Sequence, residues 1–81
     1  MTKTQILDAI DAEINNTRNI IRDMISQSNE SKATTERKYL AALIMSYQIA
    51  LTEQTVDRVL NKIHLLNHPR LSTFIDGINN A

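Results

Sequence analysis

Hydrophobic and polar positions alternate with a helical period along most of the chain. From residue 7 to residue 24, apolar side chains recur at spacings of three and four, while charged and amide side chains fill the opposite positions. This pattern predicts an amphipathic helix over about residues 4–27, capped by Thr2 or Thr4 and buried on one side. The positions on its buried side are Leu7, Ile10, Ile14, Thr17, Ile21 and Met24, flanked by Ile6, Ile20 and Ile25.

The longest uncharged stretch covers residues 39–52. Four good helix formers follow it, Glu53, Gln54, Arg58 and Lys62, and no Gly or Pro occurs before Pro69. We therefore expect one continuous helix over residues 36–66, roughly 45 Å long at about 1.5 Å per residue. One long apolar stripe follows this helix with coiled-coil spacing and is the natural mate of the first helix. Its positions are Met45, Ile49, Thr52, Val56, Val59, Ile63 and Leu66.

A second apolar stripe lies on another side of the same helix and is shorter. It ends where Gln54, Arg58 and Lys62 continue its line. Because a helix with two apolar sides must be buried on both, this stripe needs a cover of its own. We predict that it binds another protein chain, with Tyr47 as the residue most typical of an interface. The predicted partner-binding residues are Leu40, Leu43, Ile44, Tyr47 and Leu51.

The two long helices are separated by a polar link at residues 26–31, and Thr34 or Thr35 can restart the chain as a helix. A short link predicts antiparallel neighbours, so the second arm of the hairpin covers about residues 34–67. Pro69 then opens a third helix over about residues 69–77, with Gly77 as its stop. At roughly 15 Å, this helix reaches back only over residues 59–66. The predicted fold is a single all-α domain, residues 1–81: an antiparallel helical hairpin with a short third helix.

The charge balance and the absence of cysteine restrict the function. Nine basic and nine acidic side chains cancel, which argues against a nucleic-acid binder and against a basic membrane-surface helix. The third helix carries Arg70 as its single basic residue, unlike a helix that reads DNA. No cysteine is present, the uncharged run of residues 39–52 is too short to cross a bilayer, and no signal-peptide pattern opens the chain. We therefore predict a cytoplasmic protein.

Few side chains offer chemistry. His64 and His68 are four residues apart, a spacing at which two imidazoles can share a metal, but Pro69 interrupts that turn and no cysteine or suitably placed carboxylate accompanies them. Glu53 and Asp57 share a helical side but have no pocket to shift their pKa values, so we interpret them as solvated charges. The sequence therefore predicts no enzymatic activity, no cofactor and no metal.

The layout resembles the small cytoplasmic E component of type III secretion needles, a family of helical hairpins. The likeness covers residues 2–66 and rests on the Met1-Thr2 start with an early Leu7, the polar link before Tyr39, and the apolar second arm through Ala50-Leu51 and Val59-Leu60. The resemblance implies a co-chaperone that holds a needle subunit through a repeat-type partner chaperone. The shorter stripe would then be the site where that chaperone docks.

A second resemblance, to the small haemolysin-expression modulators that bind nucleoid proteins, provides the alternative. It rests on Thr2-Lys3-Thr4, Leu7, Leu51, Glu53, Thr55, Lys62-Ile63 and Phe74-Ile75. The chain departs from that family at Gln48-Ile49-Ala50, where the family has an acidic residue followed by His and Arg. A phage-type inhibitor of a host protein fits the sequence as well. Self-association through the shorter stripe is the remaining possibility, since an uncovered stripe can pair with its own copy.

Overall fold

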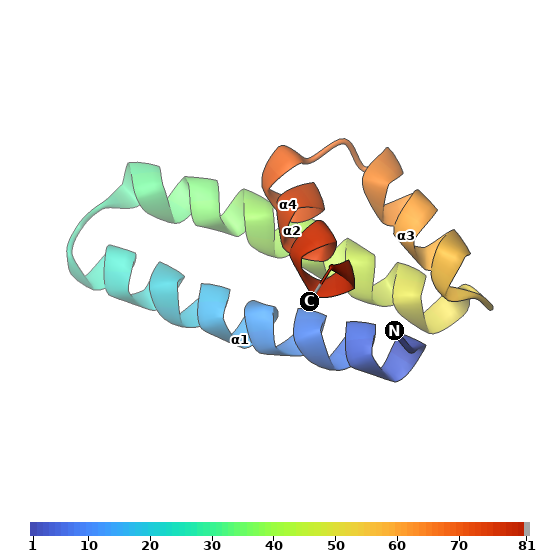
Figure 1. The fold of residues 1–81 in the computed structure, drawn as a ribbon. Helices are drawn as coiled ribbons and strands as arrows, with labels where there is room; N and C mark the ends of the chain where they lie inside the picture. The colour runs from blue at the N-terminus through green and yellow to red at the C-terminus, as the bar shows by residue number, and fades with distance from the viewer. Residues whose placement is uncertain (81) are drawn as a thin grey trace.

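Two long antiparallel helices form the body of the molecule, and two short helices fold back over the second of them (Figure 1). The computed structural model describes residues 1–80 and measures 41 × 22 × 21 Å. The predicted all-α fold with a helical hairpin is confirmed. The helices are α1 (Lys3–Ser26), α2 (Glu30–Thr52), α3 (Val56–Leu65) and α4 (Pro69–Asn79).

Helix α1 follows its predicted boundaries closely because both its cap and its buried side are encoded locally. The Thr2 hydroxyl accepts a hydrogen bond from the Gln5 amide at 3.1 Å, and the Gln5 side chain accepts one from the Thr2 amide at 2.8 Å. This capping box satisfies two backbone donors that a helix start leaves unpaired. The buried residues of α1 are Ile6, Ile10, Ile14, Thr17 and Ile21. The predicted buried side is thus confirmed in part, because Leu7, Ile20 and Met24 are half-buried and Ile25 is 44% exposed.

Helix α2 begins earlier than predicted, at Glu30 instead of about residue 34. The Asn29 side chain caps it by accepting a hydrogen bond from the Lys32 amide at 3.2 Å. Asparagine is among the strongest caps, and Glu30 in the first turn favours the positive end of the helix dipole. The prediction that Thr34 or Thr35 restarts the helix is therefore wrong.

The expected continuous helix over residues 36–66 is also wrong, because the chain reverses at residues 53–55. Glu53 is extended, with φ −80° and ψ 143°, and Thr55 caps α3 by accepting a hydrogen bond from the Arg58 amide at 3.3 Å. The Glu53 carbonyl accepts a hydrogen bond from the Lys3 ammonium, and its carboxylate pairs with Lys62. Contacts from α1 and α3 thus hold a non-helical conformation at residues whose intrinsic preference permits a helix.

The reversal changes which side chains share the core. With α3 folded back, α4 reaches the middle of α2, so the prediction that the last helix covers only residues 59–66 is wrong (Figure 1). Burial of one apolar cluster by all four helices is the main favourable term in a domain this small. The cluster contains Ile6, Ile10 and Ile14 of α1, Tyr39, Ala42, Leu43 and Ala50 of α2, Val59 and Ile63 of α3, and Leu71 and Ile75 of α4.

Helix α4 starts where the sequence predicts but ends later. Pro69 occupies the first turn, and the His68 ring nitrogen Nδ1 accepts a hydrogen bond from the Leu71 amide at 3.3 Å. Proline suits this position because its missing N–H would have no helical partner. The helix continues through Gly77 to Asn79, so the predicted stop at Gly77 is wrong.

Candidate protein-binding surface

The five predicted partner-binding residues do not form one exposed surface. Leu43 is fully buried in the core cluster, so it cannot contact another chain while the protein is folded. Leu40 and Tyr47 are half-buried and pack against the same cluster. Ile44 and Leu51 remain 41% and 50% exposed. The structure therefore leaves two of the predicted residues freely available and gives the others wholly or partly to the core.

The exposed side of α2 is nevertheless mainly apolar over the C-terminal half of the helix, and we call this part the α2 outer face. No charged residue lies between Lys38 and Glu53. Met45, which was predicted to pack against the first helix, is instead 53% exposed. The residues of the α2 outer face recur at spacings of three and four, so they lie on one side of the helix. Assigning each residue to the right side of the helix would have separated them from the buried residues in the sequence. The α2 outer face consists of Ala41, Ile44, Met45, Gln48, Leu51 and Thr52.

A cluster of polar and aromatic side chains joins three helices at the start of α4. The buried Tyr39 hydroxyl donates to the Glu13 carboxylate at 2.9 Å, and the Arg70 guanidinium lies over the Tyr39 ring, 3.9 Å from its centroid. Arg70 also donates to the Glu36 carboxylate at 2.9 Å. The His68 ring lies 5.8 Å from the Tyr39 ring, centroid to centroid. The ion pair and the cation–π contact attach α4 to α2, and the hydrogen bond from Tyr39 to Glu13 joins α2 to α1.

The protonation state of Tyr39 suits a structural role. Burial raises the pKa of its hydroxyl well above the usual range, and the hydrogen bond to Glu13 raises this pKa further. The hydroxyl therefore stays protonated and donates at every physiological pH. Because Glu13, Glu36 and Arg70 are each bonded within this cluster, we assign it to holding the fold together.

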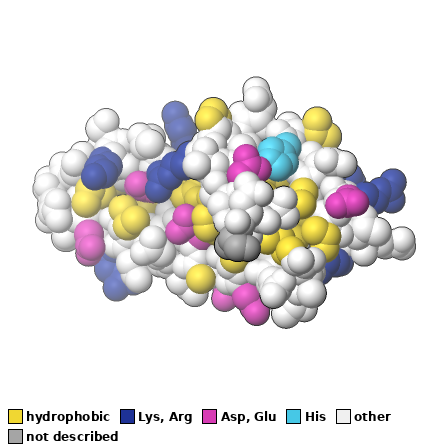
Figure 2. Space-filling model, viewed as in Figure 1, with side chains coloured by type: hydrophobic (Ala, Val, Ile, Leu, Met, Phe, Trp, Pro, Cys, Tyr) yellow, Lys and Arg dark blue, Asp and Glu magenta, His cyan; other side chains and the backbone are white. Residues whose placement is uncertain are grey.

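The two histidines serve separate purposes and are not brought together as a pair. His68 caps α4, whereas His64 links α3 to α4 through a contact of 2.9 Å between its Nε2 atom and the Asp76 carboxylate. His64 Nδ1 lies 2.6 Å from the Leu60 carbonyl oxygen. Figure 2 shows a histidine side chain against an acidic one on this side of the molecule.

We expect the α3–α4 contact to weaken as the pH rises. The hydrogen bond to the Leu60 carbonyl, followed by that to Asp76, raises the pKa of His64 above 6.5, since only the imidazolium donates through both ring nitrogens. A raised folded-state pKa contributes stability that is complete below about 6.5 and is lost as the pH rises through the folded-state value. Both side chains are substantially exposed, so the loss should stay below about 0.5 kcal/mol.

This expectation is checked by NMR titration of the His64 ring together with urea unfolding from pH 5 to pH 8. The variant His64→Gln should abolish the His64 share of the pH dependence, whereas Asp76→Asn should lower the His64 pKa. A His64 pKa at or below 6.5 in the folded chain would contradict the geometry seen here.

The carboxylates at the chain reversal behave differently from the predicted pair of solvated charges. Asp57 is exposed, but the Glu53 side chain is largely covered and bound to Lys62. The hydrogen bond from Lys62 holds the pKa of Glu53 below its usual range. Glu53 therefore stabilises the turn between α2 and α3 as an anion.

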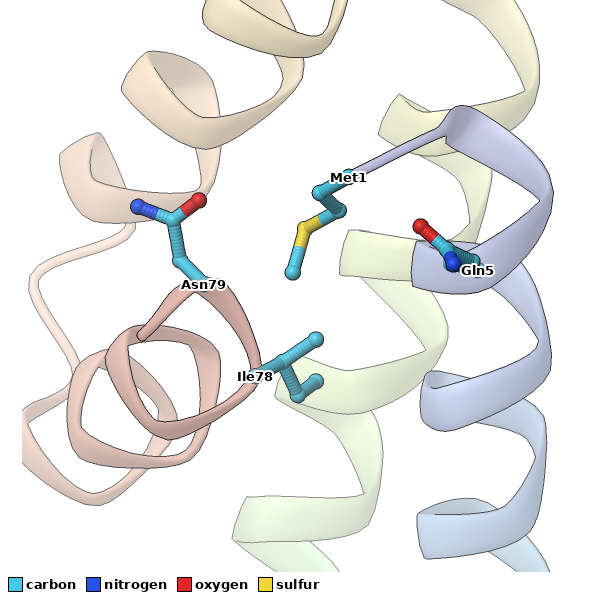
Figure 3. Close-up of a pocket in the computed structure, with 4 residues that line it drawn as sticks. All are labelled: Met1, Gln5, Ile78 and Asn79. Atoms are coloured by element: carbon cyan, nitrogen blue, oxygen red, sulfur yellow. The ribbon is translucent and has the colours of Figure 1, made fainter. Parts of the chain in front are cut away.

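A shallow cavity of about 390 Å³ lies between the start of α1 and the end of α4. Met1, Gln5, Ile78 and Asn79 line it, and Figure 3 shows the Met1 side chain extending into the space between the two helices. The four lining side chains offer no acid, base or nucleophile.

Two further findings concern metal ions and membranes. Among residues 1–80, no three His, Asp or Glu side chains converge on a point where a metal ion would be held. None of α1 to α4 combines the length and the apolar character that a membrane-crossing helix requires. Comparison of the chain with known protein families, with curated proteins and with solved structures finds no match.

Proposed function

We propose that this chain is a small non-enzymatic protein-binding module whose contact surface is the α2 outer face. The observation that supports the proposal is the exposure of Ile44, Met45 and Leu51 along a helix side without charge. Single exposed apolar residues are common on proteins, but a contiguous set on one helix side is typical of an interaction surface. Arg37 and Lys38 border this set at its N-terminal end.

The polar groups of the chain support the non-enzymatic part of the proposal. Within the described residues, every buried side-chain nitrogen or oxygen atom has a hydrogen-bond partner. Burial strongly raises the pKa of Tyr39, but the Tyr39 hydroxyl is bound to Glu13. Active sites commonly keep a perturbed group free in a cleft, whereas these groups connect helices.

The resemblance to the needle co-chaperones gives the proposal a specific form. In that form the hairpin of α1 and α2 presents the α2 outer face to a repeat-type chaperone, as a helix lying in a groove. A chain without cysteine suits the cytoplasm, where such a pair would act. Residues Val56–Leu65 and Pro69–Asn79 would add a cap on the opposite side of the hairpin core.

Site-specific photo-crosslinking tests the proposal in cells. A photoreactive residue at Gln48, in the middle of the α2 outer face, should capture a defined protein chain, whereas one at the exposed Asn61 of α3 should not. The captured chain is identified and its binding is reconstituted from purified components. The substitution Ile44→Glu should then weaken binding at least tenfold, and Leu65→Glu, at an 80% exposed apolar residue outside the face, should leave it unchanged.

Two outcomes would overturn the proposed function. One is that no protein is captured through Gln48. The other is equal capture through Gln48 and Asn61, which would show that the contact is not specific to the α2 outer face. Circular dichroism of each variant establishes that the helices are intact.

A further inference from the structure

The α2 outer face is bordered by opposite electrostatic features at its two ends. Arg37 continues the line of Ala41, Ile44, Gln48 and Leu51 toward the N-terminus, at spacings of four and three. It is half exposed and pairs only distantly with Glu30, at 3.8 Å. Lys38 lies beside it and is exposed too. The N-terminal border of the face is therefore basic.

The other end of the face is the negative pole of α2. Because the chain turns away after Thr52, the carbonyls of the exposed residues Leu51 and Thr52 receive no backbone hydrogen bond in the described part of the chain. The last carbonyls of a helix carry a partial negative charge and attract cations and hydrogen-bond donors. Asp57 and Arg58 follow in the first turn of α3 and offset each other, and Lys3 donates to the Glu53 carbonyl, so the attraction for cations at this end comes from the carbonyls of Leu51 and Thr52.

This arrangement selects the orientation of a second copy placed on the face. In a parallel pair, Arg37 and Lys38 would face their own copies and repel. In an antiparallel pair, they face the C-terminal end of the other α2, where free carbonyls accept their hydrogen bonds. Two-fold symmetry then places Ile44 and Met45 at the axis, and Ala41 opposite Gln48 of the second copy.

The area of the face is sufficient for a weak dimer. The uncharged run of residues 39–52 is roughly 21 Å long at about 1.5 Å per residue, and Ala41 permits close approach of the two helices. Burying one helix side of this length on each copy removes on the order of 1,000 Å² in total, near the lower limit for a specific interface. A contact of this size is typical of weak or transient association.

We propose that a second copy of this chain docks antiparallel on the α2 outer face, with Ile44 and Met45 at a two-fold axis and Arg37 at the C-terminal end of the other α2. The proposal rests on the general part of the proposed function, protein binding through the α2 outer face, and it places a second copy on that face instead of a chaperone. A dimer of this kind removes Ile44, Met45 and Leu51 from water, three of the large apolar side chains that the monomer leaves exposed.

Sedimentation equilibrium from 1 μM to 1 mM tests the association. The purified chain should change from monomer to dimer across this range. Ile44→Glu should raise the dissociation constant at least tenfold, and Arg37→Glu should raise it severalfold by placing an anion against the negative helix end. Gln48→Arg, at an exposed polar position, provides a second disruptive variant that does not touch the core, and Leu65→Glu should leave association unchanged.

Disulfide crosslinking tests the orientation, since the natural chain has no cysteine. A mixture of the single variants Ala41→Cys and Gln48→Cys should form a mixed disulfide dimer under mild oxidation, while each variant alone should not. If the two copies docked in parallel, each variant alone would form a disulfide dimer and the mixture would form no mixed dimer. Leu65→Cys provides the control for disulfides formed by random collision.

A chain that stays monomeric at 1 mM overturns the second-copy proposal, as does crosslinking of Ala41→Cys mainly with itself. Capture of a different protein through Gln48 would in that case still support the proposed function. Crosslinking through Gln48 that captures only the chain itself supports the dimer as the partner.

Discussion

Replacing Leu43 with alanine is expected to lower the free energy of unfolding by about 3 kcal/mol. Leu43 is fully buried, and its side chain belongs to the cluster that also contains Val59, Ile63 and Leu71. Removing three carbon atoms loses the free energy gained when they are transferred from water into the core. It also leaves a cavity that the neighbouring helices only partly close. In a domain of this size, the loss corresponds to a melting temperature lower by roughly 15 °C.

The neighbouring residue provides the matched control for this prediction. Ile44→Ala should cost below about 1 kcal/mol, because Ile44 is partly in water already. Urea unfolding followed by circular dichroism at 1 μM, a concentration at which a weak dimer dissociates, measures both variants. Equal costs for Leu43→Ala and Ile44→Ala would mean that α3 and α4 do not cover this side of α2.

Replacing Arg70 with alanine is expected to cost about 2 to 3 kcal/mol, the second largest effect. The Glu36 side chain is only 8% exposed, and its carboxylate forms an ion pair with Arg70 at 2.9 Å. Without Arg70, a largely buried charge loses its partner, and the Tyr39 ring loses the guanidinium that lies over it. The start of α4 would be attached mainly through apolar contacts.

Two further variants separate the ion pair from general packing. Adding Glu36→Gln to Arg70→Ala should restore part of the lost stability, because an amide is less costly than an unpaired carboxylate in a covered position. Arg37→Ala removes an exposed arginine whose pair with Glu30 spans 3.8 Å, and it should cost below about 0.5 kcal/mol. If Arg70→Ala costs no more than Arg37→Ala, the cluster does not hold α4.

The first helix was predictable because its information is local. A cap at Thr2, an apolar stripe on one side and a polar back all agree, so tertiary contacts had nothing to override. The start of α4 at Pro69 was predictable for the same reason, because proline both ends one helix and suits the first turn of the next.

The reversal at residues 53–55 was not predicted, since Glu53, Gln54 and Thr55 all tolerate a helix. A signal was present in Thr55 followed by Asp57, a cap residue with an acidic residue in the first turn. The contacts that hold the turn come from Lys3 and Lys62, and no local pattern shows that those lysines meet there.

The predicted binding surface was partly displaced for the same reason. On a continuous helix, the last helix would not have reached Leu43, and the shorter stripe would have stayed uncovered. The reversal brings α4 to that stripe and buries Leu43, while Met45 is left exposed because its expected mate, α1, lies against another side of α2. The sequence predicted an exposed, uncharged side on this part of the helix. Which residues form that side could be determined only once the path of α3 was known.

The hairpin extends well beyond the region that α3 and α4 cover, and its connecting turn projects from the rest of the molecule (Figure 1). From residue 22 to residue 32, every residue except Met24 is exposed to solvent. Opening of the molecule should therefore begin at this tip and progress toward the four-helix end. Amide hydrogens near the turn would exchange with deuterium through small local fluctuations, whereas those around Ile10 and Ile63 would require global unfolding.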